Sequence, residues 1–170
     1  RRITILDKML EKKYQFIVTS FEAISHKIIP KELFCKNILS FECGSREELG
    51  IIIKKLINMG YERTDIVEGK GQFAIRGGIL DIFSVDRENP LRIEMFDDEI
   101  DSIRLFDTLS QRSIDKLEKV KVLPAKEIIY SNDKRKGIVE RIKEDLDKYI
   151  KKLKNKKNSD FAKQIKANIE

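Results

Sequence analysis

The fold is decided by one short stretch of the chain, FAIRGGILDIF at residues 73–83. In its first half Phe73, Ile75 and Gly77 alternate with Ala74 and Arg76. A two-residue period of this kind is typical of a β-strand with one buried face. The following glycine pair interrupts the alternation, and we interpret it as a breaker that permits a bulge or a close backbone approach.

Two more runs have the same two-residue period. Leu91, Ile93 and Met95 alternate with charged residues, and Val120 and Val122 alternate with lysines. Short strands joined by tight connections, with no helix between them, indicate an antiparallel meander. Breaker residues separate the runs at positions 69–71, 77–78, 89–90 and 97–98.

A helix is predicted just before these strands. Residues 45–48 read Ser-Arg-Glu-Glu, which has the S-x-x-E form of a capping box and predicts a helix from about residue 46 to residue 58. Gly60 then supplies the helix stop. The apolar face of this helix can cover the sheet, so we predict an α+β fold in which an antiparallel meander is covered by a helix. That face consists of Leu49, Ile52, Ile53 and Leu56.

The flanking segments are predicted to be mainly helical. Residues 3–12 and 21–29 form helices, and Pro30 ends the second because proline disfavours helical geometry in the preceding residue. Residues 16–19 and 38–41 are apolar runs, the first rich in β-forming residues and the second predicted as a strand. Near the C-terminus a helix over residues 133–153 is expected, with a short one over residues 161–169.

The net charge of +6 is concentrated near the C-terminus. Residues 131–157 contain 11 Lys or Arg against 5 Asp or Glu, and the rest of the chain is balanced. Such a segment could contact nucleic acid weakly through Lys148, Lys151 and Lys152. Its apolar residues recur at helical spacing, however, and this favours an explanation of the lysines as the solvated side of an amphipathic helix. That apolar stripe comprises Val139, Ile142, Leu146, Tyr149 and Leu153.

Composition limits the class of protein. The 170 residues are 41% hydrophobic and 38% charged, and no apolar run reaches the length of a membrane span, so we expect a cytoplasmic protein with no membrane partner. The sequence begins with Arg1 rather than Met, and we expect it to be part of a longer chain.

Catalytic chemistry finds little support. There is no G-x-x-x-x-G-K-[ST] loop and no G-x-G-x-x-G motif. The lone His26 lies in a predicted apolar helix and is interpreted as structural, and the two cysteines lack zinc-ligand spacing. The acidic residues at 97–101 fall at a strand junction, where they serve a turn as well as a metal. We therefore predict no catalytic, cofactor-binding or metal-binding residue, and no enzyme activity for the chain.

The ordered motifs over residues 60–112 closely resemble the UvrA-interaction domain shared by the excision-repair helicase UvrB and the transcription-repair coupling factor. These motifs are GYER at 60–63, FAIRGGILDIF at 73–83, RIEMFDDEIDSIR at 92–104 and FD at 106–107.

Details favour the coupling-factor form of the domain. The runs RGGILDIF and DDEIDSIRLFD resemble that form, and residues 14–43 lack the tyrosine-rich hairpin expected ahead of the domain in UvrB. The resemblance implies a UvrA-interaction domain over residues 44–123, a partial UvrB-like flanking segment over residues 1–43 and a returning helical segment over residues 124–170. The implied function is protein docking that recruits UvrA to stalled RNA polymerase in transcription-coupled nucleotide excision repair.

RNA polymerase and DNA would be reached only through the polymerase-binding domain and the ATP-dependent translocase of a longer parent, which these residues do not include. Two alternatives stay open: a non-specific nucleic-acid-binding element built on the basic helix, and the equivalent domain of UvrB.

The resemblance also implies partner-binding residues. In UvrB, basic residues on the sheet contact UvrA, and Arg63 and Arg76 match two of those positions, whereas the third is Ala74 here. An exposed arginine on a sheet is also compatible with an ordinary solvated side chain. The alternation sets Arg76 opposite Phe73, so we expect Phe73 to pack in the core and Arg76 to be exposed.

Overall fold

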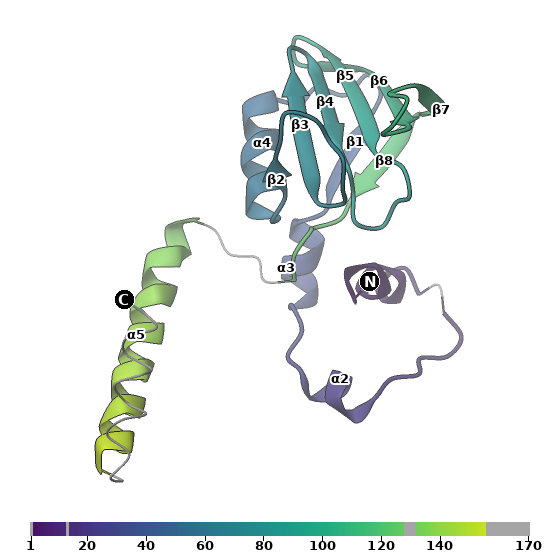
Figure 1. Ribbon diagram of the computed structural model, residues 1–170. Helices are drawn as coiled ribbons and strands as arrows, with labels where there is room; N and C mark the ends of the chain where they lie inside the picture. The colour runs from purple at the N-terminus through teal and green to yellow at the C-terminus, as the bar shows by residue number, and fades with distance from the viewer. Residues whose placement is uncertain (1, 13, 128–131, 156–170) are drawn as a thin grey trace. The chain divides into compact units, whose positions relative to one another are not determined.

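The computed structural model describes residues 2–12, 14–127 and 132–155, and the chain divides into two compact units, residues 1–129 and 130–170. Helices and antiparallel strands are mixed, which confirms the predicted α+β class (Figure 1). The first unit contains, in chain order, α1 (Arg2–Leu10), α2 (Phe21–Ser25), α3 (Lys31–Lys36), β1 (Leu39–Glu42), α4 (Leu49–Asn58), β2 (Glu62–Arg63), β3 (Gln72–Arg76), β4 (Ile79–Ile82), β5 (Leu91–Phe96), β6 (Glu99–Phe106), β7 (Ser113–Leu117) and β8 (Lys119–Val122). The second contains α5 (Asn132–Asn155).

The main sheet has six strands in the order β2-β3-β4-β5-β6-β7. From β3 to β7 each strand pairs antiparallel with the next, as the predicted meander requires. Two features differ from the prediction. The short strand β2 pairs parallel with β3, and β1 pairs with β8 in a separate two-stranded sheet where the domain's chain enters and leaves. Strands β1 and β8 are far apart in the sequence, so no local sequence pattern indicates that they pair.

One face of the sheet forms the core. Phe73, Leu80 and Ile93 are fully buried there, and they cluster with Ile52 and Leu56 of α4, which covers this side of the sheet (Figure 1). Burying one side chain of this size stabilises the fold by roughly 1.5–3 kcal/mol. The predicted apolar face of the helix and the predicted core position of Phe73 are both confirmed.

The predicted start of the covering helix is wrong. Helix α4 begins at Leu49, and Ser45 makes no capping bond but donates its hydroxyl to the Glu42 carbonyl at 2.7 Å. The segment before the helix is extended because it pairs with the start of β6: the Ile100 amide donates to the Ser45 carbonyl at 2.9 Å. Tertiary pairing therefore overrides a valid local helix signal. The predicted stop holds, since Gly60 has φ 88° and follows the last turn.

The N-terminal flank packs around Leu123. Ile3 of α1 and Phe34 of α3 are buried with Leu123 in a second apolar cluster. Lys121 of β8 fastens α1 to this cluster, because its amine lies 2.9 Å from the carboxylate of the buried Asp7 and also contacts Glu11. Burial alone would lower the pKa of Lys121, but the hydrogen bonds to these two carboxylates outweigh it and raise that pKa.

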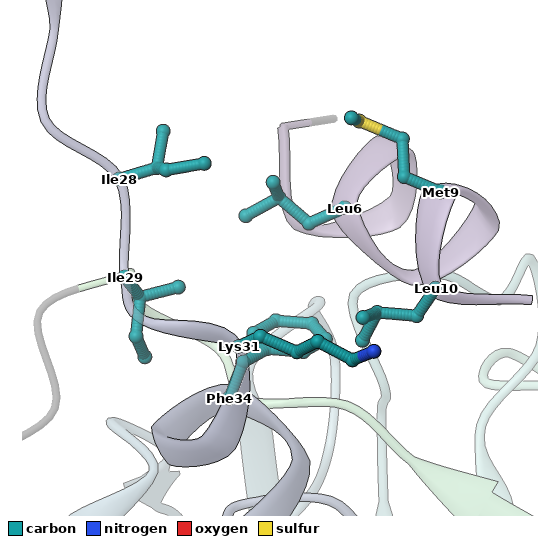
Figure 2. A pocket seen from close by; sticks show the side chains of 7 residues that line it. All are labelled: Leu6, Met9, Leu10, Ile28, Ile29, Lys31 and Phe34. Atoms are coloured by element: carbon teal, nitrogen blue, oxygen red, sulfur yellow. The ribbon is translucent and has the colours of Figure 1, made fainter.

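Several predicted elements of the flank are shifted. Residues 16–19 are not a strand, the helix predicted over 21–29 extends only from Phe21 to Ser25, and α3 was not foreseen. A mainly apolar pocket of about 140 Å³ lies between α1 and the segment leading into α3 (Figure 2). Its lining is Leu6, Met9, Leu10, Ile28, Ile29, Lys31 and Phe34.

The second unit confirms the predicted basic helix. Helix α5 extends from Asn132 to Asn155 and includes the predicted residues 133–153. In the predicted apolar stripe, Val139, Ile142 and Tyr149 are exposed. The helix predicted over residues 161–169 lies outside the described residues.

Candidate functional site

The polar side chains of the main sheet gather on the face opposite the core. Paired residues on neighbouring strands point to the same side of a sheet, and successive residues of one strand alternate. The register therefore defines two parallel rows on this face. The first row is Ala74, Asp81, Arg92, Arg104 and Lys116, and the second is Arg76, Ile79, Glu94 and Ser102.

A buried carboxylate stands at the centre of the first row. The side chain of Asp81 is 3% exposed and accepts hydrogen bonds from two guanidinium groups. Arg92 binds it in a bidentate fashion, with Nε and Nη2 each 2.8 Å from a carboxylate oxygen, and Arg76 Nη2 lies 2.8 Å from Oδ2. Paired, hydrogen-bonded charges are the form in which a carboxylate can be buried without a large desolvation cost.

Arg92 is held from three sides. Hydrogen bonding to Asp81 raises the pKa of its guanidinium, which also lies 4.2 Å from the centre of the Phe106 ring. Its Nη2 donates to the Gln111 side-chain oxygen at 3.0 Å, so the turn after β6 is tied to the same network. With its side chain 14% exposed, Arg92 is a structural partner of Asp81 rather than a free contact group.

Arg76 occupies the accessible end of this network. Its side chain is 44% exposed, while Asp81 fixes the orientation of the guanidinium. A planar group with five donors can bind Asp81 at one edge and still offer donors to a carboxylate of a partner. The alternation of residues 73–76 predicted the exposure of Arg76. It did not predict the pairing with Asp81, although Arg76 and Asp81 both lie on the polar side of the hairpin formed by β3 and β4.

Arg63 lies elsewhere on the sheet. It is exposed on the edge strand β2 and is in register with Phe73. By that register Arg63 belongs to the core side of the sheet, at its margin, whereas Arg76 belongs to the polar face. The structure therefore does not bring the two predicted arginines onto one flat surface, and a partner touching both would have to reach around the β2 edge.

Residue 74, where the resemblance implies a third basic position, is covered in this structure. Ala74 is 1% exposed and packs in a small cluster with Val67 and Phe83. Val67 belongs to the connection between β2 and β3, which covers this part of the polar face. A side chain as short as that of alanine is what the covered position accommodates.

The glycine pair at residues 77–78 forms the turn between β3 and β4, at one end of the sheet. Gly77 has φ 59°, which glycine adopts without strain. A Cβ atom on Gly78 would lie 2.5 Å from the Met95 carbonyl oxygen, and the Met95 amide donates to the Gly78 carbonyl at 2.8 Å. The close backbone approach predicted for this pair is thus confirmed, and the turn after Arg76 lies directly against the end of β5.

The other predicted residues have simpler surroundings. Lys151 and Lys152 of α5 are exposed, and Lys148 is exposed with its amine 3.3 Å from Asp145 one turn earlier. His26 is exposed and directly follows the last residue of α2, so the prediction that it lies within a helix is wrong.

In the part of the chain that the structure describes, no three His, Cys, Asp or Glu side chains gather closely enough to hold a metal ion. Within the same residues no helix has both the length and the apolar character needed to cross a bilayer. Burial raises the pKa of the Tyr61 phenol, and its hydroxyl donates to the Leu123 carbonyl at 2.6 Å. That arrangement fixes the exit of the domain and offers no accessible acid or base.

The sequence is similar to a family of interaction domains. The UvrB interaction domain matches residues 39–128, which is more than half of the chain and includes every strand of both sheets. The chain belongs to this family. It is therefore an interaction domain rather than a catalytic one.

Relatives of two kinds contain the matched region. The transcription-repair-coupling factor of Bacillus subtilis (strain 168) is 35% identical over 169 residues, covering 99% of this chain and 14% of that protein. The protein of the same name from Staphylococcus aureus (strain MRSA252) is 34% identical over 85% of the chain and 12% of its own length. UvrABC system protein B of Fervidobacterium nodosum is 32% identical over 91% of the chain and 23% of its own length. The chain thus spans less than a quarter of the length of each of these relatives.

Proposed function

We propose that this chain is the docking module through which a transcription-repair coupling factor recruits UvrA to stalled RNA polymerase. The observation that carries the proposal is the exposed Arg76, held in a fixed orientation by the buried Asp81 on the polar face of an interaction domain. Arginines of this kind often dominate interface energies because their fork binds a carboxylate bidentately. The coupling-factor assignment rests on the higher identity and fuller coverage of the chain, 35% over 99%, against 32% over 91% for the UvrB relative.

Binding of purified UvrA to the 170-residue chain, measured by isothermal titration, tests the proposal. The key variant is Arg76→Gln rather than a charge reversal, because a carboxylate at residue 76 would repel the neighbouring Asp81 and could disturb the site as well as block docking. Loss of a hot-spot arginine is expected to weaken affinity by about 30-fold, equivalent to ~2 kcal/mol.

Arg112→Gln is the matched control. Arg112 is also an exposed arginine, but it lies in the connection just before β7, at the opposite end of β6. Affinity unchanged within twofold is expected for the control. Equal binding by Arg76→Gln and wild type, with both folded, would remove Arg76 from the interface, and absence of wild-type binding would refute the docking function itself.

Arg63 is proposed as a second, separate contact at the β2 edge. Since its register sets it on the other side of the sheet from Arg76, the two should act independently. The free-energy losses of Arg63→Gln and Arg76→Gln should then add within about 0.5 kcal/mol in the double variant. A strongly non-additive result would mean that the two side chains contact one shared group of the partner.

The concentration of positive charge on α5 favours one alternative function, non-specific nucleic-acid binding. Lys148, Lys151 and Lys152 are exposed along its surface, although Tyr149 is the sole aromatic residue in the described part of the helix, so base stacking would be limited. Binding carried by phosphate contacts should weaken by orders of magnitude between roughly 50 and 200 mM salt. A titration of single-stranded DNA with the triple Lys→Gln variant tests this, and salt-insensitive binding would contradict it.

A further inference from the structure

Phe96, the last residue of β5 before the turn to β6, is an exposed aromatic residue that does not pack in the core of the sheet. Its side chain is 83% exposed although every other phenylalanine of β3 to β6 is buried. A single exposed apolar residue is ordinary on a protein surface. The position of Phe96 relative to Arg76 is what gives it meaning.

The register brings Phe96 onto the same face as Arg76. Arg76 pairs with Ile79, and Ile79 pairs with Glu94, so these three residues form one row across β3, β4 and β5. Phe96 is two residues beyond Glu94 on β5 and therefore points to the same side. The pairing of β5 with β6 shifts between Glu94 and Met95, and the extra residue belongs to β6. The side chains of β5 therefore continue to alternate: Met95 packs against the core and Phe96 is exposed.

The turn between β3 and β4 is in direct contact with the end of β5. The Met95 amide donates to the Gly78 carbonyl at 2.8 Å, and no side chain fits at Gly78. The β3–β4 turn that follows Arg76 is thereby fixed against the residue that precedes Phe96. The guanidinium of Arg76 and the phenyl ring of Phe96 thus project from neighbouring hairpins whose backbones are hydrogen-bonded to each other.

The charges around this pair differ in sign from one side to the other. The turn after Phe96 carries Asp97, Asp98 and Glu99, and Arg46 approaches the last two only to 3.9 Å. Asp97 has φ 58°, and the amide of Glu47 donates to the Asp98 carbonyl at 2.7 Å, so the turn has a defined shape. Along the end of the sheet the order is positive at Arg76, apolar at Ile79 and Phe96, and negative at the turn.

We propose that Phe96 is the aromatic anchor of the UvrA-docking surface. This inference rests on the proposed function and specifies the surface of UvrA that fits: an apolar pocket for the phenyl ring, with a carboxylate on the side of Arg76 and a basic group facing the turn at residues 97–99. An aromatic residue flanked by charges that complement the partner is the usual composition of an interface hot spot.

The test compares Phe96→Ala with Leu109→Ala in titrations of the 170-residue chain with purified UvrA. Leu109 is the matched control because it is 94% exposed in the turn between β6 and β7, at the opposite end of β6. We expect Phe96→Ala to weaken binding by about 30-fold. Leu109→Ala should bind within twofold of wild type, and both variants should keep the wild-type melting temperature because neither side chain is buried.

Asp98→Lys tests the charge order independently. It should weaken binding mainly by slowing association at low salt, because it brings a cation toward the proposed basic group of UvrA. The inference is overturned if Phe96→Ala binds within twofold of wild type, if Leu109→Ala weakens binding as much, or if Phe96→Ala lowers the melting temperature. If the wild-type chain binds UvrA, any of these results rejects only the role of Phe96 as the anchor. If the wild-type chain does not bind UvrA, the docking function itself is rejected.

Discussion

The two faces of the six-stranded sheet are built from the same strands and stabilised in different ways. On the core face Phe73, Leu80 and Ile93 are excluded from water beneath α4. On the polar face Asp81 and Arg92 form a partly buried ion pair, and Arg76 extends it to the surface. Apolar burial depends on area and tolerates small shifts, whereas an ion pair depends on geometry. The polar face is therefore the one on which a single change can alter function without unfolding the domain.

The largest effect is expected on the core face. Phe73→Ala should lower the free energy of unfolding by about 3–5 kcal/mol, because it removes a fully buried ring and leaves a cavity under α4. Urea denaturation followed by circular dichroism measures this. Exposed Phe96→Ala provides the contrast and should stay within ~0.5 kcal/mol of wild type. Similar losses for the two variants would show that the face assignment is wrong.

The next effect should come from the centre of the polar face. Asp81→Ala leaves the guanidinium of Arg92, which is 14% exposed, without its bidentate partner, and should cost roughly 2–3 kcal/mol of stability. The double variant Asp81→Ala with Arg92→Met should recover part of the loss, since no buried charge is then left unpaired. If the double variant is less stable than Asp81→Ala, the loss in Asp81→Ala does not come from leaving the Arg92 charge buried and unpaired. Chemical denaturation of all four proteins completes the cycle.

A smaller loss is expected at the exposed end of the same network. Arg76→Ala removes a half-exposed partner from Asp81 while Arg92 continues to neutralise it, so the loss of stability should be about 0.5–1 kcal/mol. Thermal unfolding at two salt concentrations measures it, and the difference from wild type should shrink at high salt. A loss as large as that of Asp81→Ala would mean that Arg76 is structural rather than available to a partner.

The smallest effect concerns the turn that Gln111 ties to Arg92. The Ser110 amide and hydroxyl donate to Asp107 Oδ1 at 2.7 and 2.8 Å, and these bonds hold the pKa of Asp107 below its ordinary value. A carboxyl with a lowered folded-state pKa contributes stability that is complete above its unfolded pKa of about 4 and is lost as the pH falls through the folded value. The stability difference between wild type and Asp107→Asn should therefore be present at pH 7 and disappear in strong acid. A difference that persists unchanged at low pH would contradict this.

The sequence motifs predicted much of the architecture and the exposure of Arg76, but not the contacts that Arg76 makes. Alternation over residues 73–76 correctly predicted that Phe73 is buried and that Arg76 is exposed, and helical spacing predicted which face of α4 is apolar. The capping box at Ser45 misled the prediction because the segment 45–47 finds backbone partners in β6 that are distant in sequence. Asp81 was missed as a partner of Arg76, since alternation assigns a residue to a face but does not say which charges on that face meet.

The sequence by itself determined the α+β class, the meander, the basic helix α5 and the exposure of Arg76, because each depends on periodicity within one or two neighbouring elements. Only the tertiary structure decided the parallel pairing of β2, the closing of β1 on β8, the burial of Ala74 under Val67 and the bidentate pairing of Arg92 with Asp81. It also decided that Arg63 and Arg76 lie on opposite sides of the sheet while Phe96 shares a face with Arg76. The physical reason is register: shifting one strand by a single residue exchanges its two faces, and register is set by contacts across the whole sheet.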